Sequence, residues 1–405
     1  MYLKRNIEEK IKNLNESFPV VLITGPRQVG KTTVLKQLAE KNRRYVTLDD
    51  FRERQLAKED PKSFLLKYKP PVIIDEVQYA PELFSYIKMH VDENKEYGGF
   101  WLTGSQAFHM MKNVSDSLAG RVGILNMFGL SNSEINKSEN ILYEPDFEML
   151  MHRIKTIKKM NMFEVYERIF MGCKPELYAN DKLDRDVFYA SYINTYISRD
   201  IRDLTQVADE DSFFKFLTVV AARTSKELNY KEMSNEIGIS EPTIKKWISV
   251  LVSSGIVFLL QPYHNNRIKR AIKTPRVYFM DTGLCAYLTK WNSPEVLESG
   301  AMSGAFFETW VVSELIKNYY NLGKVPPFYY YRDKDGKEID LIIEQNGTLY
   351  PIEIKKSSMP KRDSIKHFSV LKKTNMKIGN GSVICLIDDL LPINEKNWYV
   401  PAWLI

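Results

Sequence analysis

A glycine-rich segment at residues 25–32 has the residue types and the spacing of a phosphate-binding loop. It matches the pattern G-x-x-x-x-G-K-[ST], with an apolar run at 20–23 before it and a helical pattern at 33–39 after it. The glycines let backbone N–H groups surround phosphate oxygens, and the N-terminus of the following helix adds partial positive charge. The predicted nucleotide-binding residues are Gly25, Pro26, Arg27, Gln28, Val29, Gly30, Lys31, Thr32 and Thr33.

Two residues of this motif and two carboxylates elsewhere predict binding and hydrolysis of Mg·ATP. Lys31 would reach the β- and γ-phosphates as a catalytic residue, and Thr32 would bind Mg²⁺. The apolar run 71–74 ends in Asp75 and Glu76, and the carboxyl ends of parallel strands form the ligand edge of a sheet. We therefore predict that Asp75 completes the Mg²⁺ shell and that Glu76 orients the attacking water as a base.

A third apolar run, at 100–102, also ends in polar residues. The segment 103–106 contains Ser105, which we predict to contact the γ-phosphate or the attacking water as a catalytic side chain. The alternative interpretation is a polar strand end without a role in catalysis.

A second group of chemically active side chains lies in the last quarter of the chain. Two strand-like runs, 338–343 and 350–355, are separated by Asn-Gly, which is typical of a hairpin turn. Glu353 and Lys355 are two residues apart on one strand and share a face, and Asp340 lies on the partner strand. Such carboxylates can bind Mg²⁺ while the lysine polarises a water for attack on a phosphodiester. The alternative is a salt-bridged hairpin in solvent.

Residues 228–276 predict a helix, a turn, a second helix and a basic hairpin. Ser240 can cap the second helix, and Ile244, Ile248 and Leu251 share one face of it. A short helix, a turn and a basic helix are typical of DNA-binding proteins, and a cation-rich hairpin resembles the wing of a winged helix. The predicted DNA-contacting residues are Lys245, Lys246, Arg267, Lys269, Arg270 and Lys273. The alternative is a motif used only for packing or subunit contacts.

The elements that must position these residues follow from hydrophobic patterning. Short apolar runs alternate with helical segments over the first 130 residues, which indicates a buried parallel sheet in an α/β fold. The pattern then becomes helical, and residues 300–400 predict a helix, a hairpin, a helix and a strand. We predict an ATPase core at 1–135, a helical lid at 136–210, a winged helix-turn-helix at 211–290 and a nuclease-like α/β domain at 291–405.

Composition excludes several classes of protein. The chain has 405 residues, of which 44% are hydrophobic and 27% charged, an ordinary globular balance. No run approaches the about 18 apolar residues of a membrane span, so no membrane partner is expected. Three scattered cysteines and an N-terminus without a signal-peptide pattern predict a cytoplasmic protein. The net charge of +6 is compatible with nucleic-acid binding but does not require it.

The combined motifs carry a family resemblance that covers most of the chain. The segments GPRQVGKTT, IIDEVQ, LTGSQ, SLAGR, TYISRDIRDL and VYFMDTGL resemble a prokaryotic family of AAA+-type P-loop ATPases with a C-terminal domain of unknown function. The resemblance implies a sheet of strand order 5-1-4-3-2 and ATP hydrolysis. It also implies a homo-oligomer, a hexameric ring, in which Arg121 reaches the nucleotide of a neighbour; the alternative is an ordinary surface arginine. The hairpin is similar to the D…E-x-K core of restriction-endonuclease-like folds, with Glu308 as the helical acid.

These observations predict an AAA+-type enzyme that uses ATP as substrate with Mg²⁺ and couples turnover to DNA binding or remodelling, branched DNA included. The alternative function is a slow nucleotide-gated switch that binds DNA or protein and keeps an inactive nuclease-like scaffold.

Overall fold

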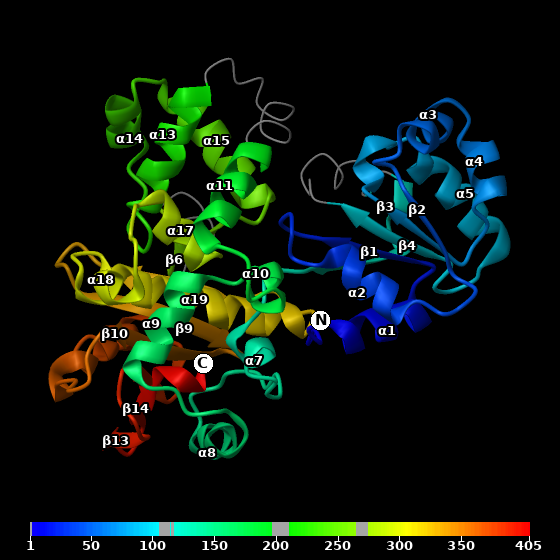
Figure 1. Ribbon diagram of the computed structural model, residues 1–405. Coiled ribbons are helices and arrows are strands. Elements are labelled where there is room, and N and C mark those ends of the chain that lie inside the picture. The colour runs from blue at the N-terminus through cyan, green and yellow to red at the C-terminus, as the bar shows by residue number, and fades with distance from the viewer. Residues whose placement is uncertain (1, 105–113, 115–116, 197–209, 265–273) are drawn as a thin grey trace.

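The computed structural model describes residues 2–104, 114, 117–196, 210–264 and 274–405. Figure 1 shows an N-terminal sheet, coloured blue to cyan, beside a larger body formed by the later residues, coloured green to red. The N-terminus lies where the two meet.

The N-terminal sheet is entirely parallel and has the order β2-β3-β4-β1-β5, so the predicted order 5-1-4-3-2 is confirmed. The predicted apolar runs coincide with the strands to within a residue or two. The strands are β1 (Val20–Thr24), β2 (Arg44–Thr47), β3 (Val72–Asp75), β4 (Phe100–Gly104) and β5 (Val122–Asn126).

Helices cover both faces of this sheet because its strands are apolar on both sides. Val20 and Leu22 of β1 pack into one hydrophobic cluster, whereas Val21 and Ile23 pack into another on the opposite face. This burial on both faces explains the continuous apolar runs in the sequence. The helices are α1 (Glu8–Ser17), α2 (Lys31–Leu38), α3 (Phe51–Glu59), α4 (Pro61–Lys67), the 3-10 turn η1 (Val77–Tyr79) and α5 (Leu83–Asn94).

The segment predicted as a helical lid contains several short helices. They are α7 (Asn132–Ile135), α8 (Phe147–Thr156), α9 (Met162–Met171), α10 (Pro175–Ala179) and α11 (Arg185–Tyr196). Helix α9 packs against α17 (Thr282–Leu288), α18 (Pro294–Ser299) and α19 (Ser303–Asn321), which come much later in the chain.

The segment predicted as helix, turn and helix follows α13 (Glu210–Ala221). It forms α14 (Tyr230–Ile237) and α15 (Glu241–Ser253), with Gly238 in the left-handed region (φ 84°) between them. The Ser240 hydroxyl accepts a hydrogen bond from the Thr243 N–H at 3.3 Å and caps α15 as expected. Strands β6 (Val257–Pro262) and β7 (Arg276–Phe279) then pair antiparallel as a hairpin.

The second sheet has the order β13-β14-β12-β10-β9-β8-β6-β7, with β11 paired to β10. Its remaining strands are β8 (Phe328–Arg332), β9 (Glu338–Gln345), β10 (Thr348–Lys355), β11 (Lys377–Ile378), β12 (Gly381–Cys385), β13 (Leu391–Asn394) and β14 (Asn397–Pro401). The β9–β10 turn has positive φ at both Asn346 and Gly347, as an Asn-Gly hairpin requires.

We expected a helix after this hairpin, but the structure has short 3-10 segments there in place of an α-helix. The structure has the 3-10 segments η3 (Arg362–Ile365) and η4 (Phe368–Thr374), and a last one, η5 (Ala402–Leu404), at the C-terminus. Ile365, Phe368 and Leu371 recur every third residue, and this is the period of a 3-10 helix rather than of an α-helix.

The β6–β7 hairpin is part of the C-terminal sheet. Gln261 of β6 pairs in parallel with Tyr329 of β8. One hydrophobic core runs from Tyr143 to Ile405, so the segments predicted as lid, winged helix and nuclease-like domain share one interior. The residue boundaries of these three predicted domains remain predictions.

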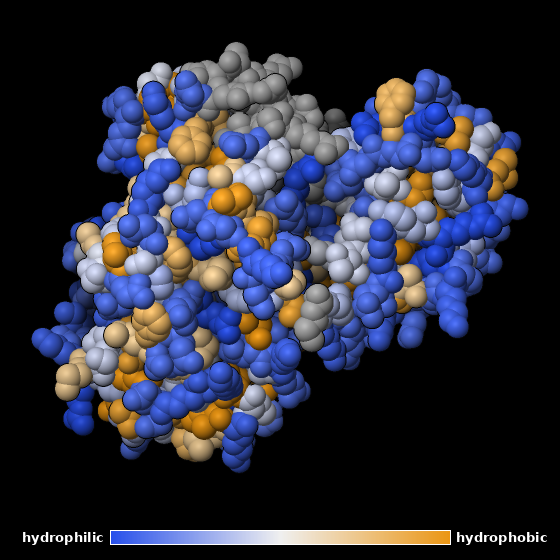
Figure 2. All heavy atoms as spheres, viewed as in Figure 1, coloured by the Kyte–Doolittle hydropathy of each residue, from blue (hydrophilic) through white to orange (hydrophobic). Residues whose placement is uncertain are grey.

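Hydrophilic side chains dominate the face of the molecule shown in Figure 2. Among the described helices, none combines the length and the hydropathy needed to cross a bilayer.

Candidate functional site

The phosphate loop has the backbone that its glycines predict. Gly25 has φ 141°, and a Cβ there would lie 2.0 Å from the Met127 carbonyl oxygen, so this position requires glycine. Gly30 has φ 89° and precedes the first residue of α2. The loop therefore delivers its backbone N–H groups at a helix N-terminus, where phosphate binds favourably.

Lys31 lies inside the loop. Its buried ammonium donates to the carbonyl oxygens of Gly25 at 2.9 Å and Pro26 at 2.7 Å. Burial lowers the pKa of Lys31 to about 8, although the neighbouring Glu76 carboxylate opposes the shift. A lysine held in this way has its charge at the centre of the loop, where a triphosphate would stabilise it.

Asp75 collects hydroxyl groups from three elements at the end of β3. Its Oδ1 accepts from the Thr32 hydroxyl at 2.8 Å, and its Oδ2 accepts from the Tyr45 hydroxyl at 3.0 Å. The Thr103 hydroxyl also donates to Oδ1. A threonine hydroxyl beside a carboxylate is the oxygen donor set that Mg²⁺ prefers. Thr32 and Asp75 would thus hold the ion that a nucleotide brings.

A cavity of about 430 Å³ opens over the loop. Glu76 lines it from the end of β3, in a left-handed backbone conformation (φ 57°) that a non-glycine residue seldom adopts. Tyr192 and Thr195 of α11 also line it, and we did not predict them as site residues. The complete lining is Arg27, Gln28, Gly30, Lys31, Thr32, Thr33, Glu76, Tyr192 and Thr195.

Two buried cations from outside the motif donate hydrogen bonds to backbone carbonyls of the loop. Arg5 donates to the carbonyl of Val29 at 2.6 Å and pairs with Glu134 at 3.0 Å. Lys174, which precedes α10, donates to the carbonyl of Arg27 at 2.9 Å. A single arginine and a single lysine carry no sequence signal for such a role, so only the folded structure reveals that Arg5 and Lys174 contact the loop.

Two further predicted catalytic residues have different outcomes. Arg121 makes a two-pronged pair with Asp92 of α5, with Nε–Oδ1 at 2.5 Å and Nη2–Oδ2 at 3.0 Å. Its cation therefore contacts its own domain, and a role at a neighbour's nucleotide stays a prediction. Ser105 lies outside the described residues.

The structure brings the four predicted nuclease-site residues together. Lys355 Nζ lies 2.6 Å from Glu353 Oε1 and 3.6 Å from Asp340 Oδ2. Glu308 approaches from α19 and accepts from the Tyr278 hydroxyl at 2.6 Å. Among the described residues, however, no three His, Cys, Asp or Glu side chains form a group that could hold a metal ion.

Arg276 is the member of this cluster that the sequence did not reveal. It is the last residue of the basic hairpin expected within residues 228–276, but it is buried on β7, with its Nη1 3.6 Å from Glu308 and 3.8 Å from Asp340. It also pairs with Glu338. Burial disfavours its charge, but Tyr278 and these carboxylates raise the pKa of Arg276. Its place among carboxylates is the physical reason that it is not a wing cation.

The acids of the cluster respond to the same burial. Burial, with the neighbouring Asp340 carboxylate, raises the pKa of both Glu308 and Glu353 to about 8. The Glu353 Oε2 atom is buried and accepts no hydrogen bond from a described residue. The crowded acids thus hold their protons more tightly than exposed ones, while Arg276 and Lys355 lie close enough to pair with the carboxylates that ionise.

The predicted DNA-contacting residues fall into two groups. Lys245 and Lys246 lie exposed on α15, and Lys245 pairs with Glu241 at 2.7 Å. The predicted wing residues Arg267, Lys269, Arg270 and Lys273 lie outside the described residues.

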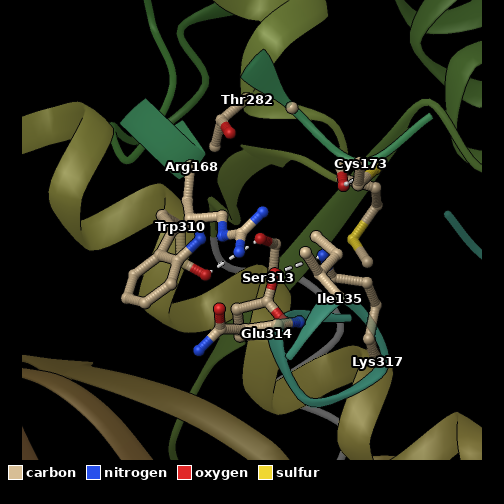
Figure 3. Close-up of a pocket in the computed structure, with 11 residues that line it drawn as sticks. Ile135, Arg168, Cys173, Thr282, Trp310, Ser313, Glu314 and Lys317 are labelled. Atoms are coloured by element: carbon tan, nitrogen blue, oxygen red, sulfur yellow. Dashed lines mark hydrogen bonds and ion pairs between the residues drawn. The ribbon is translucent and has the colours of Figure 1, made fainter. Parts of the chain in front are cut away.

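A small polar cavity of about 10 Å³ joins α19 to the end of the N-terminal domain (Figure 3). Lys317 pairs with Glu314 and donates to the Leu130 carbonyl at 3.1 Å, and Glu314 accepts from the Asn132 N–H at 2.7 Å. The space is about that of a single water. The cavity is too small for a substrate, and the hydrogen bonds around it connect α19 to residues 130–132.

Three family models match successive parts of the chain. Residues 17–136 match an AAA domain, residues 162–295 match a domain of unknown function (DUF8612), and residues 303–405 match a domain of unknown function (DUF4143). The P-loop assignment and the presence of a C-terminal domain of unknown function are thereby confirmed.

Similar proteins come from bacteria and archaea. Uncharacterized proteins of Mycobacterium tuberculosis and Mycobacterium bovis are 27% identical over 402 residues, which cover 98% of this chain and 83% of each relative. A Walker-type ATPase of Pyrococcus abyssi is 14% identical with a TM-score of 0.42, covering 71% of this chain and 96% of its own. The Thermotoga maritima RuvB Holliday junction branch migration motor is 16% identical with a TM-score of 0.31, covering 62% and 88% respectively.

The raised pKa values predict how stability depends on pH. Between about pH 5 and pH 8 the folded chain retains protons on Glu308 and Glu353 that the unfolded chain releases, so stability falls as the pH rises. The slope is about 1.4 kcal/mol per pH unit for each retained proton. Glu308→Gln removes one such proton, so urea unfolding between pH 5 and 8 should give a flatter dependence. Exposed Glu16→Gln is the control, and equal slopes in all three proteins would contradict the prediction.

Proposed function

We propose that this chain, a P-loop AAA-type ATPase with a C-terminal DUF4143 domain, binds Mg·ATP in the cavity over residues 25–33 and hydrolyses it. One observation carries the proposal: Lys31, Thr32, Asp75 and Glu76 meet at the carboxyl edge of a parallel sheet. Phosphoryl transfer needs a lysine on the phosphates, oxygen ligands for Mg²⁺ and a residue that orients water, and these residues supply each part.

Glu76 is proposed as the base. It lines the cavity beside Lys31, and its backbone N–H donates to the Thr103 hydroxyl at 3.2 Å, which fixes the end of β3. Its left-handed backbone is sterically unfavourable, and such conformations concentrate at functional sites. A carboxylate in this place can accept the proton of a water that attacks the γ-phosphate.

Lys31→Ala and Glu76→Gln separate binding from chemistry. Lys31→Ala should abolish binding of a fluorescent ATP analogue, because the loop loses its phosphate-facing charge. Glu76→Gln should keep binding while hydrolysis falls by about 100-fold or more, since it removes the base. Phosphate release and analogue titration measure the two effects, with exposed Lys41→Ala as the control. Undiminished hydrolysis in Glu76→Gln would remove that residue from its role.

The same samples address assembly. We propose an ATP-promoted ring, hexameric by family resemblance, in which Arg121 leaves Asp92 and reaches a neighbour's nucleotide. A planar cation there stabilises transition-state charge. A protein that stays monomeric by sedimentation with ATP analogue at micromolar concentration would rule out this role.

DNA is the proposed partner of the ATPase cycle. Support comes from the exposed lysines of α15, from the helix-turn-helix elements and from the cation-rich sequence 265–273. These cations would contact phosphates, so binding should show little sequence preference and a steep dependence on salt. DNA that stimulates turnover indicates a motor or remodelling enzyme, whereas unchanged slow turnover indicates the nucleotide-gated switch.

The double charge reversal Lys245→Glu/Lys246→Glu tests this surface. DNA affinity should fall at least tenfold at low salt, and the slope of log affinity against log salt should decrease by about one per lysine. Fluorescence anisotropy with linear, single-stranded and four-way DNAs measures both, with and without ATP. Lys158→Glu/Lys159→Glu is the matched control, an adjacent exposed pair in which Lys159 also pairs with an acid. Equal losses in both double variants would contradict a specific contact by α15.

For the C-terminal cluster we propose a nuclease-like scaffold without cleavage activity. The supporting observation is Arg276, whose buried guanidinium lies among Glu308, Glu338 and Asp340, where a divalent cation would otherwise balance the charge. Arg276 itself already pairs with these acids. Loss of either partner from such a buried set would leave an uncompensated charge.

Nicking of supercoiled plasmid tests the scaffold against the nuclease. With Mg²⁺ or Mn²⁺, wild type and Lys355→Ala should give the same trace, because the lysine compensates charge instead of activating water. Nicking by wild type that disappears in Lys355→Ala would establish the nuclease alternative, with Asp340, Glu353 and Glu308 as its acids.

A further inference from the structure

The phosphate loop packs against the start of the β6–β7 hairpin. Gly255, just before β6, packs so tightly on Pro26 that a Cβ at Gly255 would lie 2.9 Å from the proline ring. After β7, the Met280 N–H donates to the Ile256 carbonyl at 3.0 Å, which joins the two ends of the hairpin into one base. The loop that would bind phosphate therefore contacts the base of the hairpin whose sequence carries the predicted wing.

Lys174 connects the loop to the other end of this base. Its buried ammonium donates to the Arg27 carbonyl at 2.9 Å and lies 4.0 Å from the centre of the Tyr192 ring, which lines the nucleotide cavity. The preceding residue, Cys173, donates its N–H to Asp281 Oδ1 at 3.2 Å.

Asp281 fixes the start of α17 directly after the hairpin. The same Oδ1 accepts from the Tyr189 hydroxyl at 3.0 Å and from the Gly283 N–H at 3.1 Å. A continuous path thus runs from the Arg27 carbonyl, through a part-buried hydrogen bond to Lys174 and a buried one from Cys173, to Asp281 just after β7.

We propose that Lys174 is a positioning residue that couples nucleotide at the phosphate loop to the base of the β6–β7 hairpin, so that Mg·ATP binding alters the exposure of β6 and β7. This inference rests on the proposed function, since it requires ATP at the loop. A bound triphosphate attracts the loop N–H groups and the Lys31 ammonium, and the backbone shift that follows moves the Arg27 carbonyl. Because Lys174 is buried, its ammonium stays paired only if residues 173–174, and with them Asp281, follow the carbonyl.

The experiment compares hydrogen exchange with and without a saturating non-hydrolysable ATP analogue. Lys174→Met removes the ammonium and keeps a long apolar side chain. Arg153→Met is the matched control, because Arg153 is also a buried cation that donates to carbonyls, those of Leu404 and Ile141 at 2.6 Å, within the C-terminal body. Lys174→Arg keeps a cationic donor and is the conservative variant. Analogue titration on each protein sets the saturating concentration.

Wild type and Arg153→Met should show nucleotide-dependent protection of peptides covering 255–262 and 274–284. Lys174→Met should bind the analogue at least tenfold more weakly, since a charged hydrogen bond to the loop is lost. When saturated it should lose that protection, and Lys174→Arg should restore it. Protection in saturated Lys174→Met equal to that of wild type would overturn the proposal.

Two further outcomes separate the coupling from the proposed function. Analogue binding by wild type without protection of the hairpin peptides would overturn the coupling and leave the ATPase proposal intact. No analogue binding by wild type would instead remove the proposed function itself. If Lys174→Met does not fold, Lys174→Arg decides: a folded protein that binds analogue and shows no hairpin protection overturns the coupling.

Discussion

Buried cations hold the backbone carbonyls of the phosphate loop, and the rest of the structure depends on this. Lys31 binds two carbonyls of its own loop, Arg5 of the N-terminal segment binds that of Val29, and Lys174, just before α10, binds that of Arg27. A buried charge without partners costs several kcal/mol, about the net stability of a whole domain at the extreme. The shape of the loop therefore depends on two distant segments, those of Arg5 and Lys174, as well as on its own lysine.

The same constraint acts in the opposite sense at the C-terminal cluster. There the crowded groups are acids: burial raises the pKa of Glu308 and Glu353, and Arg276 and Lys355 lie beside these acids and Asp340 as cations. Since Arg276 lies on β7, the hairpin supplies a cation to this cluster, and β6 of the same hairpin also joins the second sheet by pairing with β8. The hairpin thus contacts both the phosphate loop and the C-terminal acidic cluster, because its base packs on Pro26 and its second strand carries Arg276.

The segments after the N-terminal sheet share one hydrophobic core. Helix α9, the helix-turn-helix elements and the C-terminal strands all bury apolar side chains in one cluster. Packed interiors transmit displacement because they are dense and have few voids. In the proposed coupling, a change at the loop would be passed through this packed core to the hairpin and the helix-turn-helix elements.

Local patterns in the sequence were sufficient to predict the parts that depend on near neighbours in the chain. The strand order of the N-terminal sheet followed from family resemblance, and its strands followed from apolar runs that must be buried on both faces. The phosphate loop and the Asn-Gly turn followed from conformations that glycine and asparagine allow. The convergence of Asp340, Glu353 and Lys355 followed from the two-residue period of strands.

Only the tertiary structure decided which distant side chains meet. Arg276 had the sequence context of a wing cation, yet the pairing of β6 with β8 places it among carboxylates. Lys174 and Tyr192 carried no motif of their own, and the packing of the segment that contains α10 and α11 brings Lys174 to the loop and Tyr192 to the nucleotide cavity. Periodicity determines which face of an element is buried, but the partner of that face is set by the long-range packing of the whole chain, which no local spacing encodes.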